Sequence, residues 1–160
     1  MKRGSTLFLK IAVICIGLPV LALCLFGLPV MAVEAGGSET GFAYVMYGIL
    51  AVMYAAAIPF FAALYQAFKL LNYIDKNKAF SELALKALKV IKYCAVAISG
   101  LYVAGMPLFY IFAELGDAPG VILIGAGFVF APAVVAVFAA VLQKLFQHAI
   151  DIKSENDLTV

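Results

Sequence analysis

Long apolar stretches separated by short polar segments dominate the pattern of this chain. Four stretches hold no charged residue: 11–33, 42–68, 93–113 and 121–142. Each reaches the length of about 20 residues with which a helix crosses about 30 Å of hydrocarbon. None alternates apolar and polar residues as barrel strands do, and lipid admits only helices or closed barrels. The pattern predicts an all-α polytopic membrane protein, a bundle of four transmembrane helices that forms a single membrane domain over 1–160.

The composition supports this prediction. Hydrophobic residues make up 66% of the chain and charged residues only 12%, whereas a soluble domain has about 25% charged residues. A soluble core of this size has no room for so much apolar surface, so a soluble globular domain is excluded.

Charge placement predicts the orientation. All eleven basic residues flank one side of the predicted membrane, before the first span, in the middle loop 69–92 and in the tail 143–160. In the other two connections the only charged residues are acidic, among them Glu34 and Glu114. The positive-inside rule then places both termini and the middle loop in the cytoplasm. The basic start also resembles a signal peptide, but its apolar run exceeds the usual 7 to 15 residues, so we expect it to remain as a span.

The middle loop has the pattern of a locally folded segment. A polar turn at 75–78 is followed by Ser81, which suits a helix N-cap. Phe80 before it and Leu85 after it are spaced as a hydrophobic staple. From there Leu85, Leu88 and Ile91 share one helical face. The loop therefore predicts a short cytoplasmic amphipathic helix between the second and third spans.

The lysines of this loop predict its contacts. We expect them to rest on anionic headgroups, and a protein-docking surface is the alternative. The candidate contact residues are Lys76, Lys78, Lys86, Lys89 and Lys92.

Each predicted span also contains proline, which bends helices. Kinks are expected at Pro19, Pro29, Pro59, Pro107 and Pro132. Small residues at four-residue spacing, such as Gly100 with Ala104 and Gly127 with Ala131, predict close helix packing within the bundle rather than a dimer seam.

The sequence offers little chemistry for catalysis. It shows no nucleophile beside a base, no glycine-rich phosphate loop and no paired carboxylates in one span. The cysteines Cys15, Cys24 and Cys94 form no close pair, and His148 is the only histidine. The prediction is a protein that is not an enzyme, with no metal site and no cofactor. Ordinary solvation of Glu34 and Glu114 is favoured over a shared cation.

The segment from Leu70 to Ile91 resembles the middle loop of a bacterial family of four-helix membrane proteins of unknown function. The matching positions are Phe80, Ser81, Glu82, Leu88 and Ile91, while Ala79 stands where that family usually has proline. Members of the family are often encoded beside a small helix-turn-helix regulator. The resemblance implies a bacterial inner-membrane protein with a cytoplasmic regulator as its partner.

The leading hypothesis is a non-enzymatic sensory or regulatory protein that engages this regulator. The alternatives are a small oligomeric channel or transporter for an apolar or cationic compound, and an immunity-type protein against a membrane-active peptide. The predicted partners are the lipid bilayer, the regulator and a homo-oligomer. Direct binding of nucleic acid is not expected, because the basic loop is needed at the membrane.

Overall fold

The computed structural model describes residues 3–37, 40–78 and 80–159, and these residues fold into long helices with short connections. Four of its helical rods are long and apolar enough to cross a membrane, which confirms the predicted fold class. The elements are α1 (Arg3–Ala22), a π-helical turn η1 (Leu23–Gly27), α2 (Leu28–Gly36), α3 (Thr40–Asp75), α4 (Glu82–Leu115) and α5 (Gly120–Thr159). We call the continuous rod α1–η1–α2 the first span.

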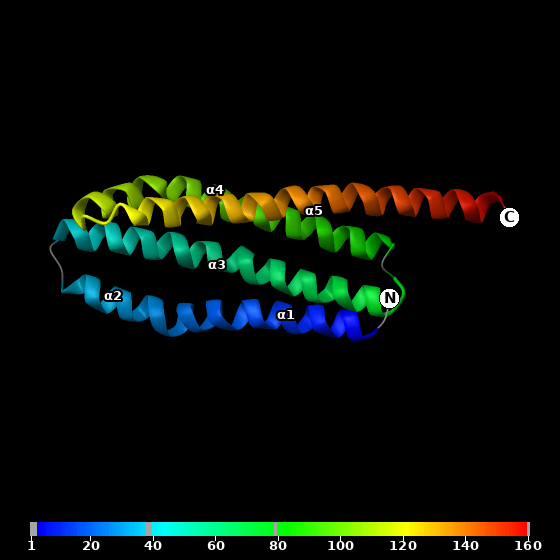
Figure 1. Ribbon diagram of the computed structural model, residues 1–160, viewed down its shortest axis with the longest axis horizontal. Coiled ribbons are helices and arrows are strands. Elements are labelled where there is room, and N and C mark those ends of the chain that lie inside the picture. The colour runs from blue at the N-terminus through cyan, green and yellow to red at the C-terminus, as the bar shows by residue number, and fades with distance from the viewer. Residues whose placement is uncertain (1–2, 38–39, 79, 160) are drawn as a thin grey trace.

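The rods run up and down side by side (Figure 1). The start of α1, the loop between α3 and α4, and the end of α5 lie at one end of the bundle, which we call the lysine end. The loop between α4 and α5 lies at the opposite end, the carboxylate end. At the lysine end, α5 projects past the α3–α4 loop (Figure 1).

The connection between α3 and α4 is shorter than the sequence predicted. Residues 69–75 continue α3, and residues 82–92 are the first turns of α4. The amphipathic stretch is therefore the beginning of the third spanning helix and not a separate short helix. The helix continues from the amphipathic stretch into the apolar run, because residues 82–99 contain no proline or glycine.

The helices α3 and α4 end in the same motif. Asn77 and Asp117 have positive φ angles of 60° and 49°, which these residue types tolerate better than most. The next N–H groups, of Lys78 and Ala118, donate to carbonyls five residues earlier, at 2.7 and 2.9 Å. These are Schellman turns, which satisfy the last carbonyls of α3 and α4 and reverse the chain sharply.

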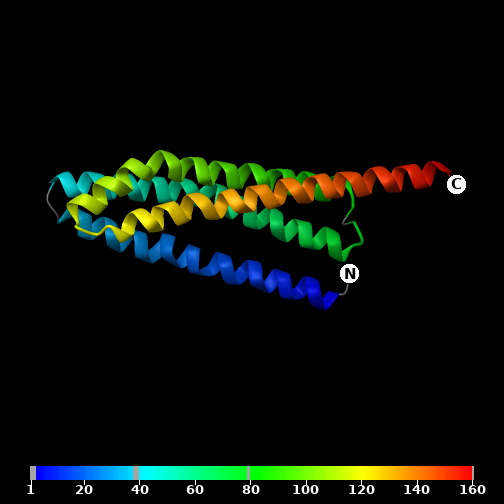
Figure 2. The same cartoon turned by 45° about the horizontal axis from the view of Figure 1, so that its top comes forward.

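The core lies between α3, α4 and α5. Its buried cluster includes Ile49 and Ala56 of α3 with Ile98, Tyr102 and Phe109 of α4. From α5, the Phe128 ring stacks on that of Tyr102 at 5.0 Å between centroids. The first span packs mainly against α3, at one side of this three-helix core (Figures 1 and 2).

The small-residue pairs face away from the core, contrary to the prediction. A Cβ atom added at Gly100 or at Gly127 would meet nothing within 4 Å. The close approaches occur instead at Gly105, where a Cβ would lie 3.1 Å from Val52, and at Gly125, which adjoins Met106 and Phe109. Spacing showed which residues share a helix face, but not which face turns toward the other helices.

The first span contains a π-helical turn immediately before Pro29. The N–H of Leu28 donates to the carbonyl of Leu23, five residues back. Pro29 has no N–H, so neither residue leaves a backbone donor for the carbonyl of Cys24. The hydroxyl of Tyr54, from α3, donates to this oxygen at 2.7 Å. A neighbouring helix thus satisfies a polar group for which lipid has no donor.

The other four prolines of the predicted spans lie inside regular helices, and Pro119 is in the α4–α5 turn. Pro19 is in α1, Pro59 in α3, Pro107 in α4 and Pro132 in α5. Near Pro132 the hydroxyl of Ser99 donates to the carbonyl of Val129 at 2.9 Å, next to the carbonyl of Phe128 that the missing N–H of Pro132 leaves free. Two proline-bearing segments are therefore tied to their neighbours by side-chain hydroxyl groups.

Candidate functional site

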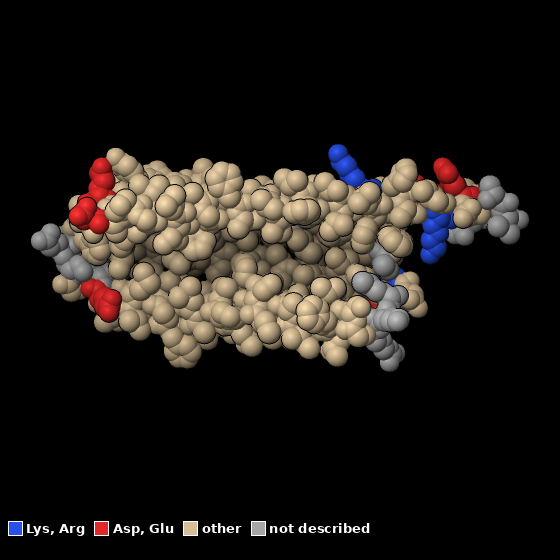
Figure 3. All heavy atoms as spheres, viewed as in Figure 1, with Lys and Arg blue, Asp and Glu red and all other residues tan. Residues whose placement is uncertain are grey.

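Charged side chains gather at the two ends of the bundle, and the middle of the visible face shows none (Figure 3). The same face is hollowed along the line between the first span and the helices above it (Figure 3). Because the apolar middle matches the hydrocarbon, the polar chemistry of the described residues lies at the ends.

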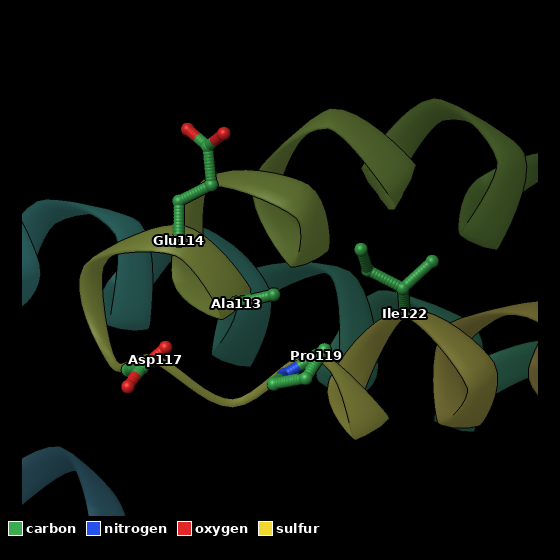
Figure 4. Close-up of a pocket in the computed structure, with 5 residues that line it drawn as sticks. All are labelled: Ala113, Glu114, Asp117, Pro119 and Ile122. Atoms are coloured by element: carbon green, nitrogen blue, oxygen red, sulfur yellow. The ribbon is translucent and has the colours of Figure 1, made fainter.

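The carboxylate end offers a shallow pocket of about 460 Å³ beside the α4–α5 turn. Glu114 and Asp117 line it, but their carboxylates point away from one another (Figure 4). Within the described residues, no three side chains of the metal-binding types come together. This geometry does not gather ligands around a cation.

At the lysine end, an ion pair joins the first span to α3. The Nζ atom of Lys10 lies 2.8 Å from Oδ2 of Asp75, and the side chains are only 19% and 23% exposed. The same ammonium lies 5.5 Å from the ring centroid of Phe68. Sixty-five positions separate the two charges in the chain, so sequence spacing did not indicate the pair.

Ser81 lies at the N-cap of α4. Its Oγ atom accepts a hydrogen bond from the N–H of Ala84 at 3.4 Å and donates to the carbonyl of Lys78 at 2.6 Å. The ring of Phe80 packs edge-on against Phe146 of α5, at 5.3 Å between centroids. Leu85, which the sequence paired with Phe80, is half-buried. Phe80 thus links the loop to α5, a contact that the local pattern did not reveal.

The amphipathic stretch of α4 uses its apolar face inside the protein. Ala84, Ala87 and Leu88 are buried, while Lys86 and Lys89 are exposed. Lys92 is half-buried, with its ammonium 4.9 Å from the ring centroid of Tyr93. The stretch runs along the bundle and does not present an apolar face for resting on a membrane.

A second pocket, of about 710 Å³, lies between the α3–α4 loop and α5. We call it the loop pocket. Its lining combines an apolar floor with lysines from two elements: Ile74, Asn77, Lys78, Phe80, Ser81, Phe146 and Lys153. Of the predicted contact residues, Lys78 lines this pocket, whereas Lys76, Lys86 and Lys89 are exposed elsewhere at the lysine end. The sequence did not single out Lys153 or Phe146, because only the fold brings them to the loop.

The C-terminal part of α5, from the level of the loop pocket onward, carries exposed apolar side chains among polar ones. Leu145, Ile152 and Leu158 are exposed. The amide Nε2 of Gln147 donates a hydrogen bond to Oδ1 of Asp151, one turn later, at 3.1 Å. His148 is exposed on the same segment. The cysteines Cys15, Cys24 and Cys94 are free thiols.

Residues 30–160 match the family described as "Protein of unknown function (DUF2975)". The chain belongs to this family. It is 61% identical to the "Uncharacterized membrane protein YoaS" of Bacillus subtilis (strain 168), over 160 residues and the full length of both chains. No solved structure matches. The predicted family is confirmed: the protein is a multi-pass membrane protein of a family of unknown function, with a bacterial homologue.

Proposed function

We propose that the protein is a non-enzymatic regulatory protein of the bacterial inner membrane, which binds a cytoplasmic transcription regulator at its lysine end. The observation that carries this proposal is the amphipathic stretch of α4. Its apolar face is buried by the protein itself, and Lys86 and Lys89 remain exposed on its outer face. Such a surface of positive charge steers and orients an acidic partner.

Distance from the membrane supports a protein partner over headgroups for part of this surface. Lys92 lies at the edge of the charge-free run, and at 1.5 Å per residue Lys86 stands about 9 Å further along α4. The headgroup layer is about 5 to 8 Å thick on each side. Lys92 therefore stays within reach of lipid phosphates, whereas Lys86 and the loop lysines Lys76 and Lys78 extend beyond them.

The exposed apolar residues of α5 give the same surface a second feature. Ile152 and Leu158 are exposed on the helix that projects past the loop. Exposed apolar side chains on a projecting helix can enter apolar pockets of a partner protein. The lysines would supply the orientation, and these side chains the buried contact.

This proposal requires the lysine end to face the cytoplasm. Basic residues flank that end, and acidic residues occupy the connections at the other. A green fluorescent protein fused after Val160 should therefore fluoresce, and alkaline phosphatase fused there should stay inactive. Active phosphatase at this position would contradict the orientation and with it the proposed docking surface.

The partner test is capture of a helix-turn-helix regulator of the kind that the family resemblance implies. Purified full-length protein in detergent should retain this regulator, and the triple variant Lys86→Glu, Lys89→Glu, Lys92→Glu should lose it. Reversal of close charges across an interface costs several kcal/mol, so we expect binding to fall at least about a hundredfold. Rising salt should weaken the wild-type complex as well, which surface plasmon resonance can measure.

A variant at the opposite end controls for a general effect of altering charged residues. Glu114→Gln with Asp117→Asn alters the carboxylate end and should leave capture unchanged. The fluorescent fusion on the triple variant checks that its orientation is preserved. Equal capture by the wild type and a correctly oriented triple variant would contradict the proposal.

The outward small residues of α4 and α5 support self-association as a further interaction. Gly100 and Gly127 have open space above their Cα atoms, and small residues at four-residue spacing let membrane helices approach closely. A homo-oligomer joined along these faces leaves the lysine end free for the regulator.

A further inference from the structure

The loop pocket combines features that a binding site for an anion requires. Lys78 comes from the α3–α4 loop and Lys153 from α5, so lysines of two different elements line one pocket. The 34-residue helix α4 begins at this pocket, with Ser81 as its N-cap. The positive end of the helix dipole therefore adds to the two charges. None of the described residues that line the pocket is acidic.

The floor of the pocket is apolar and aromatic. The rings of Phe80 and Phe146 meet edge-on at 5.3 Å, and Ile74 lies beside them. An inorganic anion gains nothing from apolar contacts, whereas an organic ligand can bury an apolar or aromatic group against these side chains. The volume of about 710 Å³ lies within the range of small-molecule sites, about 300 to 1,000 Å³.

The acidic groups that the structure describes nearby lie outside the pocket lining. Asp75 is engaged with Lys10 at 2.8 Å, and Asp151 accepts a hydrogen bond from Gln147. Glu82 is exposed on the first turn of α4 and is absent from the pocket lining.

The height of the pocket decides between a lipid and a soluble ligand. Lys153 lies eleven residues beyond the end of the predicted fourth span, and Glu82 eleven residues before the start of the third. At 1.5 Å per residue, both positions stand about 16 Å outside the hydrocarbon. A headgroup layer about 5 to 8 Å thick does not reach that far.

We propose that the loop pocket binds a phosphate group carried by a small organic molecule of the aqueous phase, with Lys78 and Lys153 on the phosphate and the body of the ligand on Phe80 and Phe146. Ser81 holds the loop in place, since its hydroxyl is committed to the Lys78 carbonyl and the Ala84 N–H. This inference is independent of the regulator and can fail or hold separately.

The test uses the full-length protein in detergent, with radiolabelled adenosine monophosphate as the probe in equilibrium dialysis. Inorganic phosphate serves as a competitor, and phosphatidylglycerol in nanodiscs as the lipid arm. The double variant Lys78→Gln, Lys153→Gln should weaken probe binding about thirtyfold, since each lysine contributes a factor of about five. Phe146→Ala should weaken the adenosine probe about fivefold or more and leave inorganic phosphate unaffected.

The matched control is Lys86→Gln with Lys89→Gln, which removes the same charge from the same end but outside the pocket. It should change probe binding less than twofold. Equal losses in the two double variants would overturn the proposal, because non-specific attraction would then explain them. It would also be overturned if neither the probe nor phosphate bound, or if phosphatidylglycerol alone bound through Lys78 and Lys153.

Discussion

Replacing Gly105 by leucine is expected to separate α3 from α4 and to destabilise the protein by about 3 kcal/mol, the upper part of the usual range for overpacking. A Cβ atom at this position would already stand 3.1 and 3.2 Å from the two methyl groups of Val52. Leucine adds three more carbons at a point where backbone and side chain meet directly. Against a total stability of about 5 to 15 kcal/mol, the loss is large.

The measurement is equilibrium unfolding of the purified protein in mixed micelles with increasing sodium dodecyl sulfate. Gly100→Leu provides the control, because it makes the same exchange in the same helix, where a Cβ would meet open space. Its effect should stay within about 0.5 kcal/mol. If both variants unfolded at the same detergent fraction, the packing of α4 against α3 described here would be wrong.

The second large effect is expected at the ion pair of the first span. Lys10→Asp places a second carboxylate against Asp75, where the two side chains are 19% and 23% exposed. Leaving a largely buried charge without its partner costs about 3 kcal/mol, and repulsion adds to this. The first span should then detach from α3 at its lysine end, and the midpoint of unfolding should fall accordingly.

Exchanging the two residues provides the decisive comparison. The double variant Lys10→Asp, Asp75→Lys restores opposite charges and should recover more than half of the lost stability. Lys144→Asp, at an exposed position of α5, controls for removal of a basic residue and should change stability little. Additive losses in the exchanged variant would show that the two side chains do not interact.

The spans were predictable because lipid excludes charge, so four charge-free runs mark four helices. The facing of each helix was not predictable. In water a buried face differs from a solvated one in polarity, but in lipid both faces are apolar. Gly100 and Gly105 therefore look equivalent in the sequence, although only Gly105 touches another helix.

The lysine end was predictable in charge but not in architecture. The N-cap position of Ser81 follows from a local pattern, because its partner Ala84 is three residues away. The loop pocket requires Lys153 to lie near Lys78, seventy-five positions apart, which only the pairing of α5 with the loop determines. The π-helical turn likewise depends on Tyr54, whose hydroxyl reaches Cys24 from another helix.

The attachment of the first span to α3 at the side of the core also bears on the order of folding. Synthesis proceeds from the N-terminus, so α1, α2 and α3 enter the bilayer before α4 and α5 exist. The buried cluster of α3 needs Tyr102 and Phe109 from α4, and their stacking partner Phe128 comes from α5. Until α4 and α5 arrive, the first span and α3 are held together by the hydrogen bond from Tyr54 to the Cys24 carbonyl and by the Lys10–Asp75 ion pair. The core of this protein is therefore complete only when its last helix, α5, has packed against α4.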